Sequence, residues 1–115
     1  DGYLFLSGRA DDVIVRGGEN ISPGEIEDLL HQHSAIADTA AVGIPSEEWG
    51  EVVALTVVVA TGQSITEDEI RSHIREHLRS SRVPEAIHFT LELPYNETGK
   101  LLRRVVRDWF RHEED

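Results

Sequence analysis

Apolar positions recur along the chain with two different periods, and these periods predict an α+β domain. Residues 36–45 and 51–60 are rich in alanine and β-branched residues and predict two strands. The second run, EVVALTVVVA, has almost no polar position, which is typical of a strand at the centre of a sheet. Residues 86–91 predict a third strand, and residues 3–6 and 13–16 predict two short strands as an N-terminal hairpin.

Two segments carry the signals of a helix start. Ser22 is the expected N-cap of the first helix, with Pro23 at the first helical position and Glu25 completing a capping box. Thr66 and Glu69 form the same box at the start of the second helix.

A third, amphipathic helix closes the chain. Its apolar positions are Leu101, Leu102, Val105, Val106 and Trp109. Its expected solvent-exposed face carries Arg103, Arg104 and Arg107. The predicted order is therefore β-β-α-β-β-α-β-α. This order favours an N-terminal β-hairpin plus a small sheet of about three strands, flanked by helices.

Composition limits the possible classes of protein. The 115 residues suffice for one ordinary domain, and 39% of them are hydrophobic. The chain contains no methionine, even at position 1, so we expect it to be a segment of a longer protein or a processed product. The absence of cysteine excludes disulfides and thiolate metal sites.

Charge and hydropathy narrow the possible partners. A net charge of −11 argues against binding along a nucleic-acid backbone. No run approaches the roughly 18 apolar residues of a membrane span, and no signal-peptide pattern opens the chain. We therefore expect a cytoplasmic protein without a membrane span.

Two motifs resemble catalytic signatures but lack essential parts. His73 and His77, with Glu76 between them, match the H-x-x-E-H pattern of zinc peptidases. That chemistry needs a third ligand from another helix and a cleft, so a solvated helix face is the better interpretation and no metal site is predicted. The Thr-Gly-Lys at residues 98–100 lacks the earlier glycine and the following Ser or Thr of a phosphate-binding P-loop.

Two further features have both an ordinary and a functional interpretation. Gly17 and Gly18 can simply form a turn into the Ser22 cap, or leave room for a ligand to pass the backbone. Lys100 is the single lysine beside ten arginines. It is either an ordinary exposed lysine or a compact charge that bridges two oxygens as negative charge shifts between them. Composition alone does not choose between these interpretations.

Two long motifs together resemble the signature segments of one superfamily. Residues 8–27, GRADDVIVRGGENISPGEIE, and residues 93–104, LPYNETGKLLRR, resemble segments of the adenylate-forming enzymes. These enzymes comprise acyl- and aryl-CoA ligases, adenylation domains of peptide synthetases, and beetle luciferases. The opening DGYLFLSGR is similar to the stretch that joins their large N-terminal domain to the small C-terminal one.

The resemblance implies a domain organisation and a two-step reaction. Residues 1–12 would be the hinge segment leading from an N-terminal domain that is missing here, and residues 13–115 the small C-terminal lid domain. In the first step a carboxylate attacks ATP to give an acyl-adenylate, and in the second a thiol, usually coenzyme A, takes the acyl group. The small domain rotates between the steps, and Asp11 matches the hinge position. The full-length enzyme would use ATP, Mg2+, CoA and a carboxylic acid.

The resemblance also assigns roles to individual residues. Lys100 matches the catalytic lysine of the first step, and Arg9 matches a residue that approaches the adenylate. Residues 17–20, Gly17, Gly18, Glu19 and Asn20, match the loop that lines the tunnel for the pantetheine arm of CoA. Trp49 matches a tryptophan that stacks on the CoA adenine in some ligases, with packing in the core as the alternative.

Three positions depart from the pattern of the superfamily. Ser81 stands where an aromatic residue is frequent, and Glu85 where a lysine is frequent. Both positions can contribute to CoA nucleotide binding in the family, so these departures leave the mode of CoA contact open, although Arg82 could still meet a phosphate. Val15 departs from the lysine of luciferase-like members. The loop GGENISPGEIE favours a CoA ligase for a fatty or aromatic acid.

The large domain of this superfamily carries the ATP-phosphate loop and the acid pocket, so we expect this segment alone to be inactive and to hold no cofactor. The alternatives are an adenylation domain that charges a carrier protein and a non-catalytic binding module of the same fold.

Overall fold

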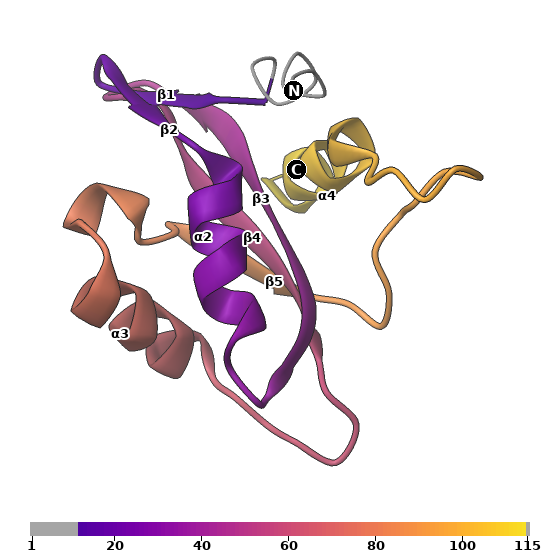
Figure 1. The fold of residues 1–115 in the computed structure, drawn as a ribbon. Coiled ribbons are helices and arrows are strands. Elements are labelled where there is room, and N and C mark those ends of the chain that lie inside the picture. Colours follow the sequence, from indigo (N-terminus) through magenta and orange to yellow (C-terminus); the bar gives the residue numbers. More distant parts are fainter. Residues whose placement is uncertain (1–11, 115) are drawn as a thin grey trace, which may run out of the picture.

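A mixed sheet with helices on both faces forms the framework of the domain (Figure 1). The computed structural model describes residues 12–114. The elements are β1 (Ile14–Arg16), β2 (Glu19–Ile21), α2 (Pro23–His31), β3 (Ile36–Ser46), β4 (Gly50–Val59), α3 (Glu67–His77), the 3-10 turn η1 (Ser80–Arg82), β5 (Ala86–Phe89) and α4 (Arg103–Glu114). The predicted α+β class is confirmed, with five strands joined in one sheet.

Strand β4 lies at the centre of this sheet, as its apolar run predicted. Along one edge it pairs antiparallel with the whole of β3, from Val59 opposite Ile36 to Gly50 opposite Ser46. Two strands share its other edge. β1 pairs with β4 at its beginning, through Arg16 and Gly50, and β5 pairs parallel to its second half.

Both faces of the sheet are covered, which explains why the central strands lack polar alternation. Helices α2 and α3 pack on the face to which β4 contributes Val53, Leu55 and Val57. Helix α4 packs with Val106 and Phe110 on the opposite face, against a cluster that includes Ala40, Val42, Val52 and Ala54. The sheet is therefore the middle of three layers.

The described part of the chain opens with a β-hairpin whose second strand was not predicted. It joins β1 to β2, with Arg16 opposite Glu19, and its two-residue turn is Gly17–Gly18. Both glycines have positive φ, +57° and +86°, which the tight turns matching the twist of a hairpin require. The predicted strand at residues 3–6 lies outside the described residues. The paired glycines thus make a hairpin turn rather than a link into the Ser22 cap.

One of the two predicted capping boxes is confirmed. Thr66 accepts a hydrogen bond from the Glu69 amide at 3.1 Å, and Glu69 accepts one from the Thr66 amide at 2.8 Å. Ser22 is the N-cap of α2, but its side chain makes no capping bond, so that box was wrong. The reason is that the Glu25 carboxylate accepts a hydrogen bond from Nε of Arg82 at 3.0 Å instead.

Candidate functional site

Lys100 lies on the closing side of a tight loop that begins and ends at the bridged pair Tyr95 and Leu101, and its carbonyl accepts a hydrogen bond from the Asn96 amide at 2.9 Å. The Asn96 Oδ1 atom accepts hydrogen bonds from the amides of Thr98 and Lys100, each at 2.9 Å. Gly99 supplies the left-handed residue of the turn, with φ of +84°. The loop therefore fixes the backbone of Lys100 while its side chain remains exposed.

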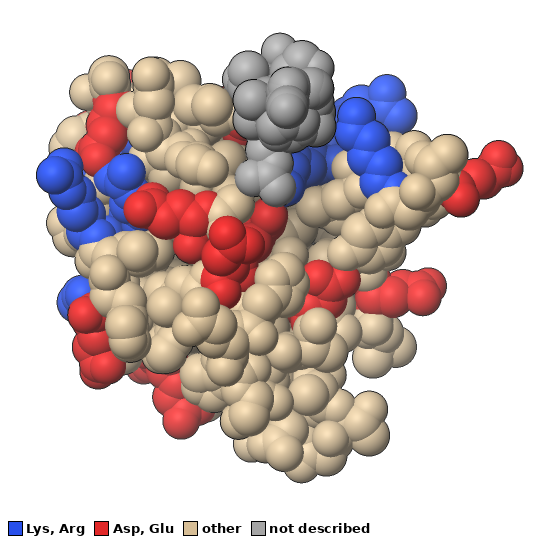
Figure 2. Space-filling view, in the orientation of Figure 1, with Lys and Arg blue, Asp and Glu red and all other residues tan. Residues whose placement is uncertain are grey.

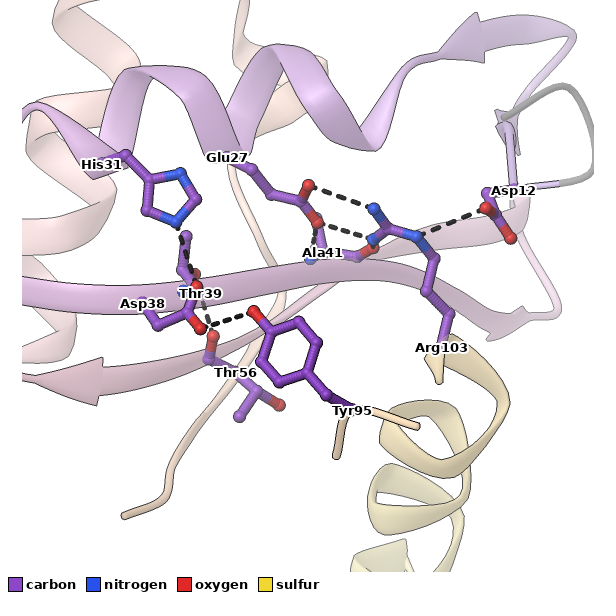
Figure 3. A network of polar contacts seen from close by, with 9 residues as sticks. All are labelled: Asp12, Glu27, His31, Asp38, Thr39, Ala41, Thr56, Tyr95 and Arg103. Carbon is purple, nitrogen blue, oxygen red and sulfur yellow. Dashed lines mark hydrogen bonds and ion pairs between the residues drawn. The ribbon is translucent and has the colours of Figure 1, made fainter. Parts of the chain in front are cut away.

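Tyr95 ties this loop to the sheet. Its hydroxyl donates to Oδ2 of Asp38 on β3 at 2.6 Å, and Nε2 of His31 lies 3.1 Å from the other oxygen of Asp38 (Figure 3). Burial and the neighbouring carboxylate raise the pKa of Tyr95 to about 12. Burial acts to raise the pKa of Asp38, but the hydrogen bonds from Tyr95 and His31 outweigh it and the pKa is lowered. The phenol thus stays protonated and donates to an ionised carboxylate.

An arginine at the start of α4 joins three parts of the chain (Figure 3). Arg103 donates two hydrogen bonds to the Glu27 carboxylate, at 2.6 and 3.1 Å, and one to the Ala41 carbonyl at 2.9 Å. Its Nε lies 3.4 Å from Oδ2 of Asp12. Burial opposes the charge, but the bonds to Glu27 outweigh it and raise the pKa of Arg103. The expectation that Arg103 lies on the solvent-exposed face of the helix was therefore wrong.

A cationic hollow of about 440 Å³ lies beside Lys100. Its lining residues are Asp12, Lys100, Leu101, Leu102, Arg103, Arg104 and Arg107. Figure 2 shows basic side chains gathered over α4 on this side of the molecule. Asp12 and Glu27 both engage Arg103, so Lys100, Arg104 and Arg107 are the cations that fit an anionic ligand such as a phosphate chain.

The turn of the hairpin packs against Trp49. The Gly17 amide donates to the Trp49 carbonyl at 2.7 Å, and a Cβ at Gly17 would lie 2.8 Å from Cε3 of the indole. The Arg16 guanidinium lies 4.0 Å from the centre of the same ring. Trp49 is 36% exposed and belongs to neither apolar cluster, so packing in the core does not explain it. A Cβ at Gly18, by contrast, would meet no atom within 4 Å.

We call the hairpin turn together with Trp49 the hairpin surface. The other residues predicted for the hairpin surface lie on β2. The Glu19 carboxylate accepts a hydrogen bond from Arg82, and this bond lowers the pKa of Glu19. Asn20 is exposed and lies opposite Val15 in the hairpin. Arg82 was considered free to meet a phosphate, but Glu19 and Glu25 both hold its guanidinium.

The hairpin surface and the hollow beside Lys100 lie apart in the fold. In Figure 1 the hairpin turn and the loop before α4 project from opposite sides of the sheet. The structure therefore brings Gly17, Gly18 and Trp49 together and places Lys100 elsewhere. Asp11 and Arg9 lie outside the described residues.

A histidine cluster lies between α2 and α3. The rings of His73 and His77 are 4.7 Å apart, and the His33 ring lies 5.2 Å from that of His73. Within residues 12–114 there is no group of three acidic, histidine or cysteine side chains placed to hold a metal ion. In the same part of the chain, no helix is long and apolar enough to span a membrane.

Sequence reasoning missed the residues that support the Lys100 loop. The sequence held a signal for the ion pair of Glu27 with Arg103. Glu27 lies at helical spacing from Pro23 and Leu30, which are both on the buried face of α2. A carboxylate on such a face needs a partner. No comparable signal indicated that Tyr95 would reach Asp38, 57 residues away.

Comparison with known proteins agrees with this arrangement. Residues 25–100 match the family model described as the AMP-binding enzyme C-terminal domain. The long-chain-fatty-acid–CoA ligase of Salmonella typhimurium is 42% identical over 115 residues, 100% of this chain and 20% of the ligase. A fatty acid–[acyl-carrier-protein] ligase, ScoC of Streptomyces coeruleorubidus, is 40% identical over 110 residues, 96% of this chain and 21% of ScoC.

A solved structure shares the fold as well. The acyl-CoA synthetase of Brucella canis superposes with a TM-score of 0.83 at 33% identity, over 94% of this chain and 20% of that one. The fold and these matches define a small domain of the adenylate-forming enzymes. The chain belongs to the AMP-binding enzyme C-terminal domain family. It spans about a fifth of the length of the curated relatives that it matches.

Proposed function

We propose that residues 13–115 are the mobile lid domain of an ATP-dependent, AMP-forming carboxylate–CoA ligase, with residues 1–12 as the hinge segment. The observation that carries the proposal is Lys100, the single lysine of the chain, exposed on a loop whose backbone is fixed. The domain would act together with a large N-terminal domain of the same chain and would be inactive alone. A fatty acid and an aromatic acid are both candidate substrates; the name of the Salmonella typhimurium relative supports the fatty acid, and that of the 2-succinylbenzoate–CoA ligase of Geobacillus supports the aromatic acid.

In the first step Lys100 would lie between the two reactants. A carboxylate oxygen attacks the α-phosphorus of ATP, and pyrophosphate leaves. Negative charge builds on the oxygens around phosphorus, and the ammonium would stabilise it from a preorganised position. Arg104 and Arg107, which line the same hollow, would add to the positive potential there.

In the second step the hairpin would face the acceptor. The thiol attacks the acyl carbon, the thioester forms, and AMP leaves. Gly18, where a Cβ would meet no atom within 4 Å, would let the pantetheine arm pass close to the backbone, while Gly17 makes room for Trp49, which would lie near the nucleotide. Mg2+ would accompany ATP and bind chiefly through its phosphates.

The alternative acceptor is a carrier protein. ScoC, whose name specifies an acyl-carrier-protein, is 40% identical to this chain, which keeps this second candidate open. A preference for a phosphopantetheinyl protein over free CoA would identify it.

The test separates the two half-reactions in the full-length protein. In Lys100→Ala, pyrophosphate release with a panel of acids should fall about 100- to 1000-fold, equal to about 2.7–4 kcal/mol. Thioester formation from ready-made acyl-adenylate should survive. Gly18→Asn should do the reverse, because asparagine tolerates positive φ while its side chain enters the space expected for the acceptor. If Lys100→Ala carries out both steps at normal rates, Lys100 has no catalytic role. This domain would then be better described as a binding module of the same fold.

A further inference from the structure

Arg16, the cation nearest to Trp49 on the hairpin surface, is held by a carboxylate. Its guanidinium lies 4.0 Å from the centre of the indole ring, and one nitrogen lies 3.8 Å from a carboxylate oxygen of Glu85. Glu85 follows Pro84, in the segment between η1 and β5, and its side chain is 52% exposed. A carboxylate from a distant part of the chain therefore keeps Arg16 over the aromatic ring.

Neighbouring arginines are engaged in a similar way. Arg82 donates to both Glu19 and Glu25. Arg71 donates to the Pro84 carbonyl at 2.9 Å and pairs with Glu67 at 3.4 Å.

Arg79 differs from these arginines. It is 83% exposed and lies 3.9 Å from Glu19. Acidic and basic side chains accordingly alternate on the left side of Figure 2.

This arrangement affects the binding of a phosphorylated ligand. A phosphate that approached Trp49 would have to compete with Glu85 for the Arg16 guanidinium and would meet a second negative charge. A planar base that stacked on the indole would also have to share the ring with Arg16. An uncharged thiol arm passing Gly18, where a Cβ would meet no atom within 4 Å, would meet neither obstacle. Repulsion of one class of ligand is a usual means of discrimination at binding sites.

We propose that Glu85 is a specificity-determining residue, which holds Arg16 over Trp49 and thereby disfavours the phosphorylated nucleotide of an acceptor. The inference rests on the proposed function and deepens it. The acceptor chemistry that this surface fits is the pantetheine thiol arm, with little contribution from the nucleotide of CoA. Glu85 acts through Arg16 and is not a catalytic residue.

The test uses the full-length protein supplied with ready-made acyl-adenylate and compares CoA with pantetheine. Glu85→Gln should lower the KM for CoA by about two- to fivefold, the range expected for one exposed ion pair, and leave kcat unchanged. The KM for pantetheine should be the same in Glu85→Gln and in the wild-type protein. The difference for CoA should shrink at high salt, because screening weakens exposed charges.

Asp108→Asn provides a matched control. Asp108 on α4 is 50% exposed and lies 3.9 Å from Arg111, so this change removes an equal charge from a comparable pair elsewhere. It should leave both KM values unchanged. If Glu85→Gln changes neither KM, or changes both equally, the role of Glu85 is refuted while the ligase stands. If the wild-type protein forms no thioester with either thiol, the proposed function itself fails.

Discussion

The ion pair between Arg103 and Glu27 allows the loss of stability on its removal to be worked out from geometry. Arg103→Met keeps most of the apolar stem but deletes the two hydrogen bonds to Glu27, at 2.6 and 3.1 Å. The Glu27 side chain is only 11% exposed, so its carboxylate would keep the Ala41 amide as a donor and little else. Removing one partner of a buried pair costs about 3–5 kcal/mol. This is a large part of the roughly 5–15 kcal/mol that stabilises an ordinary domain.

Urea unfolding of the 115-residue chain, followed by circular dichroism, measures this loss. The free energy of unfolding of a small domain falls by about 1–3 kcal/mol for each molar of urea. A loss of about 3 kcal/mol therefore lowers the urea concentration at the unfolding midpoint by roughly 1–3 M. The adjacent Arg104 is exposed and serves as a control, so Arg104→Met should stay within about 0.5 kcal/mol of wild type.

A second variant tests whether the charge left behind causes the loss. Adding Glu27→Gln to Arg103→Met removes that charge while the amide oxygen can still accept from Ala41. The double variant should therefore be more stable than Arg103→Met alone. The reasoning is refuted if the double variant loses the sum of the two single changes, or if Arg103→Met unfolds at the same midpoint as Arg104→Met.

Two further predictions concern the hairpin and the histidine cluster. Gly17→Ala should be less stable in thermal unfolding than Gly62→Ala: both positions have positive φ, but only the Cβ at Gly17 meets another group, Cε3 of Trp49 at 2.8 Å. Equal losses would show that backbone strain alone matters there. Burial first, and then the charges of His77 and His33, lower the pKa of His73 from its ordinary value of 6.5. The folded state then binds this proton less readily than the unfolded chain, so stability should fall as pH drops through that value. His73→Gln should reduce the fall in urea midpoint between about pH 7.5 and about pH 5.5, and an unchanged fall would contradict this account.

The pattern of apolar residues predicted the framework of the fold because burial on both faces leaves a direct trace in sequence. The run at residues 51–60 became β4 because both of its faces are buried, and Thr66 with Glu69 formed the expected cap because a capping box depends only on neighbouring residues. The sequence did not predict β2 as a partner of β1, because the pairing of a strand depends on which segment reaches it, a choice that the short apolar run at residues 13–16 does not specify.

Arg103 shows why the support of the candidate site was harder to predict. The expected apolar face was largely right, because Val106 is buried and Leu101 and Trp109 pack against the same cluster, but the pattern did not show that α4 begins at Arg103. The buried residues Val106 and Phe110 follow Arg103 at steps of three and seven, which puts the arginine on their face. The motif around Lys100 was visible in sequence, whereas its anchor from Tyr95 to Asp38 depends on contacts across 57 residues.

The central position of β4 has a consequence for how the domain opens. Three strands pair with β4, so its amides can reach solvent only when these pairings break, and the sheet should behave as one cooperative unit in hydrogen exchange. The hairpin turn is attached to this unit through the hydrogen bond from Gly17 to the Trp49 carbonyl, and the Lys100 loop through that from Tyr95 to Asp38. Local fluctuations at either end can then occur at low free energy without disturbing the other. The stiff sheet would let the two segments adapt to different reactants independently.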